Sequence, residues 1–233
     1  PSIGDAVTKK LDEFIKSGKV NNLEQLKLQY GDEAIQAYQQ EKIKQEKKNV
    51  FLQIYGIGDA TAEKIVELGI LTIDELIERK DEEIQGKGKK KLKLLNDGQQ
   101  KGLEYYKQIQ ERIPRSEIEE YKQVLNTVFD IAIKTDKTDK TDKTDKFEIV
   151  GSYRRGKPDS GDIDIIITSL KDDKTVFNKF LELLKERDII KATLTHGEKK
   201  SYVIAKLNET SIARRLDFLY TPPEEYAFAI LYF

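Results

Sequence analysis

The sequence predicts an α+β fold in which a helical region precedes a β-sheet. The first 110 residues have the pattern of short helices separated by glycine-bearing turns. From about residue 147 onward, short alternating or continuous apolar runs replace this pattern, as strands do. Helices followed by a sheet are typical of α+β proteins. The length of 233 residues allows one large domain or two small ones.

The composition narrows the chemistry that the chain can carry out. Lys and Arg number 41 against 42 Asp and Glu, so the net charge of -1 excludes a histone-like polycation but leaves nucleic-acid binding open. The absence of Cys excludes disulfides, thiolate metal sites and a cysteine nucleophile. A single histidine, His196, gives little support to a Ser-His-Asp triad or a histidine-built zinc site. Catalysis therefore has to rely on carboxylates, lysines, arginines and hydroxyls.

The sequence also bears on location and processing. No apolar run approaches the ~18 residues of a membrane span, and no segment resembles a signal peptide, so we expect no membrane partner and no secretion. Nucleic-acid binding, which the charge balance leaves open, would imply the nucleus for a eukaryotic source, and otherwise the cytoplasm or a virion. The absence of Met predicts a fragment, a processed form or an engineered chain.

Apolar periodicity predicts three helices in the first 51 residues. Ala6–Lys16 carries apolar residues on one face and ends at Ser17-Gly18, where glycine can adopt the left-handed cap conformation. A second helix is expected at about Leu23–Gln29. A third, mostly polar helix should run from Gly31 to about Phe51.

Two segments combine an apolar stretch, a glycine-bearing turn and the start of a helix. The clearer copy is Leu52–Val66, which contains Gly56-Ile57-Gly58, and the weaker copy is Pro1–Leu11. Glycines let the backbone approach a phosphate closely, and the amides at the next helix N-terminus point at it. A tight structural turn is the alternative for each copy. The duplication favours two helix–hairpin–helix motifs that hold a DNA strand.

Two further segments are dominated by charge. Lys87–Lys93 contains five lysines and no acid, so it is either a solvated loop or a patch that faces phosphates. Residues 134–146 repeat Lys-Thr-Asp with a period that matches neither helix nor strand. This repeat predicts a flexible, charge-neutral loop without chemistry.

The elements around and after this loop can be placed one by one. A helix is expected at Arg115–Ile133 and a strand at Phe147–Val150. Ile163–Thr168 alternates at first and then becomes a solid apolar run, as a buried central strand does. The remaining elements are a helix at Phe177–Glu186 and strands at Ser201–Leu207 and Leu216–Tyr220.

The most informative pattern is a set of three acids. Asp162 and Asp164 are two residues apart on a predicted strand, so both side chains leave the same face. Two crowded carboxylates repel each other unless a divalent cation lies between them. Asp217 supplies a third acid among strand hydrophobics, where it is unfavourable unless it is paired or bound to metal. Three converging carboxylates and two magnesium ions are a phosphoryl-transfer arrangement.

A Gly-Ser turn, Gly151-Ser152, precedes the acids and opens a helical element with two arginines, Arg154 and Arg155. It offers backbone amides, a hydroxyl and guanidinium groups to a polyphosphate. An Asp-x-Asp pair taken alone is more often a solvated turn or an incidental calcium site. The turn upstream and the acid downstream favour the catalytic interpretation.

These residues resemble the nucleotidyltransferase fold and, more closely, the family X (DNA polymerase beta-like) DNA polymerases. The resemblance spans nearly the whole chain in the family's order. Besides the acids, the stretches that carry it are Tyr55–Ile70, Leu95–Tyr106, Arg112–Arg115 and Leu231–Phe233. It implies a catalytic palm with a mainly antiparallel or mixed β-sheet.

The resemblance also implies roles for individual residues. Asp162, Asp164 and Asp217 would bind two Mg²⁺ ions, or Mn²⁺, with Asp217 at or near the base for the primer 3′-hydroxyl. Arg215 would orient these carboxylates, and Lys200 lies in a strand that faces the template. The incoming triphosphate would contact Arg112, Gly151, Ser152, Arg155, Ser160 and Gly161. Tyr232 and Phe233 would check its sugar, and the carbonyls of Leu52, Ile54 and Ile57 would hold Na⁺ or K⁺.

The amino-terminal helix resembles the family's deoxyribose-phosphate lyase helix, in which Lys10 falls on the Schiff-base lysine. A neighbouring Lys9 would help to depress the amine pKa, so that a neutral amine attacks the sugar aldehyde. An ordinary solvated lysine is the alternative.

The resemblance implies three parts and a truncation at both ends. Residues 1–48 would be the remnant of a lyase domain with the first motif, 49–110 a DNA-binding fingers-like part with the second, and 111–233 the palm. The family's nucleotide-closing subdomain would follow Phe233. We therefore expect these residues alone to bind gapped DNA and magnesium but to polymerise poorly.

The function implied is gap-filling, template-directed DNA synthesis by a monomer, with gapped or nicked double-stranded DNA and dNTPs as partners. A nucleotidyltransferase on RNA or a small acceptor is the first alternative, although paired helix–hairpin–helix motifs would serve it poorly. A non-catalytic DNA-binding fragment is the second.

Overall fold

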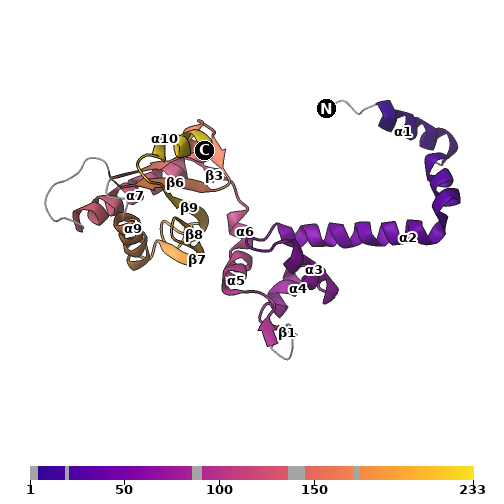
Figure 1. Ribbon diagram of the computed structural model, residues 1–233, viewed down its shortest axis with the longest axis horizontal. Helices are drawn as coiled ribbons and strands as arrows, with labels where there is room; N and C mark the ends of the chain where they lie inside the picture. The colour runs from indigo at the N-terminus through magenta and orange to yellow at the C-terminus, as the bar shows by residue number, and fades with distance from the viewer. Residues whose placement is uncertain (1–4, 19–20, 86–90, 136–144, 170–173) are drawn as a thin grey trace.

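The computed structural model describes residues 5–18, 21–85, 91–135, 145–169 and 174–233. A helical region comes first and a β-sheet covered by helices follows, so the predicted α+β class is confirmed (Figure 1). No helix in these described stretches has both the length and the apolar composition that crossing a membrane requires.

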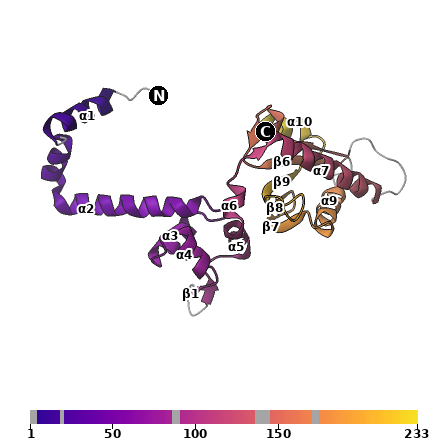
Figure 2. The ribbon, with the colours of Figure 1, turned by 180° about the vertical axis from the view of Figure 1, so that it is seen from behind.

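The first helices form an extended arm that leads into the rest of the molecule (Figures 1 and 2). They are α1 (Asp5–Ser17) and α2 (Asn21–Leu52). The two helices predicted between residues 23 and 51 meet at Gly31, whose φ of 76° and ψ of 162° are not helical. The turn of the weaker helix–hairpin–helix copy, residues 1–4, lies outside the described residues.

A small helical core follows the arm. Its elements are α3 (Asp59–Glu67), α4 (Ile73–Arg79), β1 (Glu83–Gln85), β2 (Lys91–Lys93), α5 (Asp97–Glu104) and α6 (Tyr106–Ile109). Phe51, Ile54 and Ile65 are buried at its centre. Helices α4 and α5 begin with capping boxes at Thr72 and Asn96. In each box, side chains accept hydrogen bonds from backbone amides that have no partner within the helix.

The lysine-rich segment Lys87–Lys93 and the repeat at residues 134–146, in which no helix or strand was expected, lie partly within strands and a helix. Residues 86–90 lie outside the described part, but Lys91–Lys93 forms strand β2, which pairs with Glu83–Gln85 in β1. Residues 136–144 of the repeat are also outside it, while α7 (Arg115–Thr135) and β4 (Lys146–Ile149) take up its two ends.

The second half is built on a five-stranded sheet in the order β4-β6-β9-β8-β7. The other strands are β6 (Ile163–Thr168), β7 (Ile190–His196), β8 (Lys200–Ala205) and β9 (Arg214–Tyr220). Only β6 and β9 run parallel within this sheet, and the other pairs are antiparallel. The sheet is therefore mixed, which agrees with the predicted palm.

Helices α7 and α9 (Thr175–Glu186) cover one face of this sheet. Phe129 of α7 and Phe180 of α9 pack edge to face, with ring centroids 5.2 Å apart, and Phe180 also contacts Phe218 of β9. This half also contains the short helices α8 (Gly151–Arg154) and α10 (Tyr226–Tyr232) and the strand pair of β3 (Ile113–Pro114) with β5 (Asp159–Ser160).

The helical core is held against the outer strands of the sheet. Tyr55 and Tyr105 pack on Leu194, Ile204 and neighbouring apolar side chains. Two glycines of α5 allow this close approach. A Cβ atom on Gly98 would lie 2.6 Å from the Leu194 carbonyl oxygen, and one on Gly102 would lie 2.4 Å from the Tyr55 carbonyl oxygen.

We predict that Gly98→Ala and Gly102→Ala each lower the free energy of unfolding by about 1–3 kcal/mol, because the new methyl group overpacks a backbone contact. Helix propensity alone predicts the opposite sign, a gain of roughly 1 kcal/mol. Urea unfolding followed by circular dichroism measures the difference. Gly197→Ala is the matched control, since its added Cβ atom would make only an ordinary contact, 3.8 Å from the Lys200 carbonyl oxygen. Wild-type stability of both α5 variants would contradict the interface.

Candidate active site

Strands β6 and β9 bring the three predicted acids together. Asp164 and Asp217 are direct partners in the parallel register, and Asp162 lies just before β6, two residues ahead of Asp164. One carboxylate oxygen from each of the three residues lies within 4.8 Å of the others. No other group of three or more possible metal ligands occurs among the described residues.

The alternation of the two strands explains this convergence. Ile163 and Ile165 are buried in the core under α7 and α9, and so are Leu216 and Phe218. Residues between them must point to the opposite face, because successive side chains of a strand alternate. The core therefore fixes the acids on the open face.

Arg215 is the cation of this cluster. Its Nε donates to Asp217 Oδ1 at 3.1 Å, and its Nη2 donates to Asp162 Oδ2. The guanidinium therefore bridges Asp162, which lies just before β6, and Asp217 of β9. One positive charge faces three carboxylates, so the cluster keeps an excess of negative charge.

Burial and mutual repulsion perturb two of the acids. Burial raises the pKa of Asp164 to about 6, and the charge of Asp162 adds to the rise while Arg215 opposes it. Burial likewise raises the pKa of Asp217 to about 7, against the attraction of Arg215 and with the repulsion of both other acids. Both shifts mean that the ionised cluster lacks compensating positive charge.

These properties fit divalent cations. Carboxylate oxygens are the ligands that Mg²⁺ and Mn²⁺ prefer. A two-metal site places its ions about 3.5–4 Å apart, which suits ligand atoms that gather within 4.8 Å. Asp162, Asp164 and Asp217 could therefore hold two such ions.

The glycine-serine turn lies directly against the acids. Gly151 has a φ of 64°, and a Cβ atom there would lie 2.1 Å from Asp164 Oδ2. Both observations require glycine at this position. The next residue, Ser152, shares a 2.7 Å hydrogen bond with Ser160 across the turn.

The predicted triphosphate contacts lie around this turn. Arg112 precedes β3, and its Nε donates to Asp159 Oδ1 of the paired strand β5 at 2.8 Å. A Cβ atom on Gly161 would lie 3.3 Å from Arg112 Nη1. Arg155 Nη1 donates to the carbonyl of Phe233, next to the end of α10. Arg155 and Phe233 are thus neighbours in this structure.

Two predicted residues lie outside the cluster. The Tyr232 side chain is 87% exposed and stacks edge to face on Phe233 with ring centroids 5.4 Å apart. Lys10 belongs to α1, in the arm far from the sheet in both views (Figures 1 and 2), and its side chain is outside the described part. The structure does not bring Lys10 to the carboxylates.

The three predicted carbonyl ligands occur in the hairpin between α2 and α3. Leu52, Ile54 and Ile57 line one cavity of about 290 Å³, and Arg215 also lines it. The Ile54 carbonyl accepts a hydrogen bond from the Ile57 amide at 3.1 Å. Gly56 has a φ of 81°, and its carbonyl accepts from the Gln99 side chain at 2.8 Å.

Sequence reasoning missed Tyr55 at this junction. Its hydroxyl lies 3.2 Å from Thr195 Oγ1, and its ring meets Tyr202 edge to face and lies 5.7 Å from the Arg215 guanidinium. The hairpin therefore contacts the arginine that bridges the acids. No local pattern could reveal these contacts, since Thr195 is 140 residues away in the chain.

Sequence reasoning also missed Arg214, although the alternation of β9 places it on the same face as the apolar residues Leu216 and Phe218. It is buried on the face opposite Arg215, where Nε and Nη2 each donate to the Glu117 carboxylate at 2.7 Å. Its Nη1 donates to the Glu111 carbonyl at 3.1 Å, just ahead of Arg112. This arginine links β9 to α7 and to the segment that carries Arg112.

Two family models match the chain. The fingers domain of DNA polymerase lambda matches residues 49–110, and the DNA polymerase beta palm matches residues 112–223. The second match contains the acids, the glycine-serine turn and Arg215.

Curated relatives agree with these models. A DNA polymerase lambda of Arabidopsis thaliana is 28% identical over 99% of this chain and 39% of its own length. A DNA nucleotidylexotransferase of Xenopus laevis is 24% identical over 99% of this chain and 46% of its own length. A DNA polymerase lambda of Rattus norvegicus is 24% identical over all of this chain and 36% of its own length. The chain thus spans less than half the length of these relatives.

The fingers and palm models follow one another along the chain, and the acid cluster lies within the palm match. The chain belongs to the family X DNA polymerases.

Proposed function

We propose that this chain carries out template-directed, gap-filling DNA synthesis by transferring a nucleotidyl group from a dNTP to a primer 3′-hydroxyl. The observation that carries the proposal is the convergence of Asp162, Asp164 and Asp217 within 4.8 Å beside a glycine-serine turn. The names of the relatives, two DNA polymerases and a DNA nucleotidylexotransferase, support nucleotidyl transfer to DNA.

Each residue of the site has a role in this proposal. When bound, two divalent ions would neutralise charge on the triphosphate and lower the pKa of the attacking hydroxyl. Asp217 is positioned to accept the hydroxyl proton, and Arg215 orients its carboxylate through the 3.1 Å hydrogen bond. The amides and hydroxyl of Gly151-Ser152, with Arg112 and Arg155, are suited to holding the triphosphate.

The hairpin is suited to holding the DNA. Leu52, Ile54 and Ile57 line one cavity, and we propose that their carbonyls bind Na⁺ or K⁺, which bridges to a phosphate. A DNA affinity that is equal in K⁺ and in tetramethylammonium would contradict this cation site. The cavity also reaches Arg215, so a strand held there would lead to the acids.

The remaining predictions follow from the same proposal. Gapped or nicked double-stranded DNA and dNTPs are the proposed partners, the protein is a monomer, and its location in a eukaryote is the nucleus. We propose the division into residues 1–48, 49–110 and 111–233 as an arm with lyase chemistry, a DNA-holding part and a palm. Sedimentation as a dimer at micromolar concentration would contradict the monomer.

Incorporation of a labelled dNTP into one-nucleotide-gapped DNA tests the proposed activity. We expect incorporation that requires Mg²⁺ and that falls at least about 10²-fold in Asp217→Ala, because a metal ligand and the base are lost together. Transfer only to RNA or to a small acceptor would instead support the first alternative. DNA binding without any incorporation would support the second, and an undiminished rate in Asp217→Ala would contradict the assigned site.

The raised pKa of Asp217 predicts an opposite effect of Asp217→Asn without and with metal. In the folded, metal-free chain this carboxyl holds its proton up to about pH 7, so stability present at low pH is lost as the pH rises through that value. An asparagine at this position does not ionise, so the variant does not lose this stability. In EDTA at pH 8 the variant should therefore melt at least about 2 °C higher than wild type, and the gap should shrink at pH 5.

Magnesium should reverse this order at pH 8, because the ions stabilise the folded state only through the intact carboxylate. Differential scanning fluorimetry measures both conditions. Asp130→Asn is the matched control, an exposed acid on α7 away from the cluster, and it should show neither effect. A Mg²⁺ shift of equal size in wild type and Asp217→Asn would contradict the assignment of Asp217 as a metal ligand.

We also propose that Lys10 forms the Schiff base of a deoxyribose-phosphate lyase reaction. Its position in helix α1, whose sequence resembles the family's lyase helix, supports the proposal. Borohydride reduces a Schiff base to a stable amine, so it should trap the chain on DNA with a 5′-deoxyribose phosphate. We expect Lys10→Ala to abolish trapping and Lys16→Ala, on the same helix, to retain it. Equal trapping by both variants would contradict the role of Lys10.

A further inference from the structure

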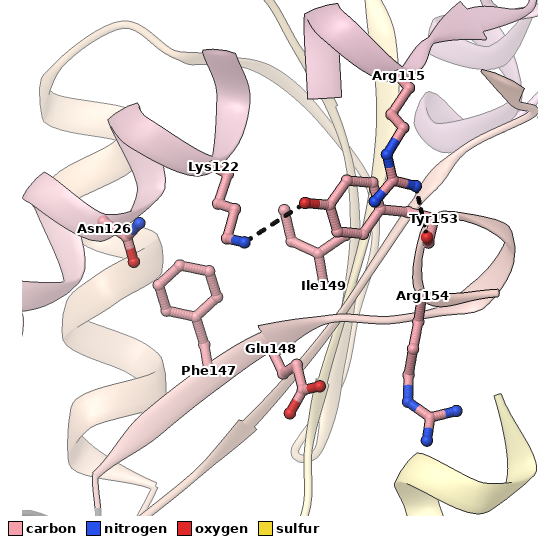
Figure 3. A pocket seen from close by; sticks show the side chains of 8 residues that line it. All are labelled: Arg115, Lys122, Asn126, Phe147, Glu148, Ile149, Tyr153 and Arg154. Carbon is pink, nitrogen blue, oxygen red and sulfur yellow. Dashed lines mark hydrogen bonds between the residues drawn. The ribbon is translucent and has the colours of Figure 1, made fainter. Parts of the chain in front are cut away.

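A second polar cavity, of about 230 Å³, lies between α7, β4 and α8. Figure 3 shows the Lys122 ammonium and the Arg115 guanidinium on opposite sides of the Tyr153 side chain, with Asn126 beside them on α7. Arg154 of α8 also lines the cavity, although its guanidinium points away from Lys122 and Arg115. The lining therefore holds three cationic side chains and one amide, together with the carboxylate of Glu148.

This cavity is separate from the carboxylate site. Phe147 and Ile149 of the edge strand β4 face the core under α7, where Phe147 meets Phe129 with ring centroids 5.1 Å apart. Asp164 points to the opposite face of the sheet, because its neighbours Ile163 and Ile165 belong to that core. A group bound at the acids does not occupy the second cavity.

Two of the cations are held in place by Tyr153. The Arg115 guanidinium stacks 4.1 Å from the ring centroid, and its Nη1 donates to the Tyr153 carbonyl at 2.7 Å. The Lys122 ammonium lies 5.6 Å from the same centroid and donates to the phenol oxygen at 3.4 Å. Cations that are already ordered lose less conformational freedom when they bind an anion.

The nearby acids are held by phenols. The Tyr153 hydroxyl donates to Glu119 at 2.6 Å, and the Tyr226 hydroxyl donates to Glu148 at 2.9 Å. Within the described part of the chain, neither Lys122 nor Arg154 has a carboxylate within 4.0 Å, and Arg115 reaches Glu119 only at that limit. The donors of Lys122 and Arg154 therefore remain open to a ligand.

We propose that this cavity binds a compact polyphosphate, either free pyrophosphate or the phosphate tail of a nucleotide whose base stays outside. Several guanidinium and ammonium donors around one space favour phosphate oxygens. The volume is below the roughly 300–1,000 Å³ of pockets that enclose drug-sized ligands, so it suits a diphosphate better than a whole nucleotide. The proposal does not depend on the polymerase activity.

Titration of the ¹⁵N-labelled chain with pyrophosphate in EDTA tests the proposal, because EDTA removes metal-dependent binding at the acids. We expect saturable shifts of the Asn126 side-chain amide and of the Arg115 and Arg154 Nε–H resonances. The Gly161 amide reports separately on the triphosphate contacts near Arg112. A second titration uses ATP in place of pyrophosphate. Shifts of the Asn126 side-chain amide with ATP identify the phosphate tail of a nucleotide as a ligand, and shifts with pyrophosphate alone identify free pyrophosphate.

The variant Lys122→Gln/Arg154→Gln should weaken pyrophosphate binding at this cavity by about tenfold or more. Lys134→Gln/Lys185→Gln, at exposed positions on α7 and α9, removes the same number of charges and is the matched control, which should bind as wild type does. Equal affinity of the double variant and wild type would overturn the proposal. So would shifts at Asn126 with single-stranded DNA or hexaglutamate but not with pyrophosphate or ATP. Unchanged melting temperatures show that both variants are folded.

Discussion

The mutual repulsion of three carboxylates is the constraint on which the rest of this structure depends. Asp162, Asp164 and Asp217 bring an oxygen each within 4.8 Å of one another, at a site where burial raises the pKa of two of them. Loosely held side chains would turn away from such an arrangement. They stay because their strands are anchored from behind by Ile163, Ile165 and their neighbours under α7 and α9. Packing of the apolar core therefore offsets the unfavourable free energy of placing the three acids together.

A second requirement is that the helical half keeps a fixed position beside this site. Gly98 and Gly102 let α5 approach β7 and the hairpin at backbone distance, so no long side chain separates the two halves. Tyr55 extends the contact to Thr195, Tyr202 and Arg215. Movement of the hairpin would therefore displace the Tyr55 ring from the Arg215 guanidinium, which bridges the acids. Both contacts are formed by small or aromatic residues, whose side chains lose little rotamer freedom when they are ordered.

The sequence predicted the site better than the architecture around it. Ile163–Thr168 was placed with its observed bounds, because a buried central strand leaves a continuous apolar run. Strand β7 was not predicted, although Ile190, Ala192 and Leu194 alternate with polar residues as in a half-buried strand. Helix α10 was not predicted either, because Tyr226–Tyr232 is apolar on all sides and has no side-chain cap. The parallel pairing of β6 with β9 could not be derived, since these strands are not consecutive. The contacts of Tyr55 depend on the antiparallel pairings of β7 with β8 and of β8 with β9, which bring Thr195, Tyr202 and Arg215 together.

The pairing register also explains why two adjacent arginines have opposite environments. Arg214 points toward α7 and is buried against Glu117, while Arg215 points to the open face and bridges two acids. A slip of β9 by one residue would exchange them and would turn Asp217 into the apolar core. The buried pair opposes this slip, because an unpaired Arg214 or Glu117 in the core is strongly unfavourable. The ion pair behind the sheet therefore maintains the register that the carboxylates in front require.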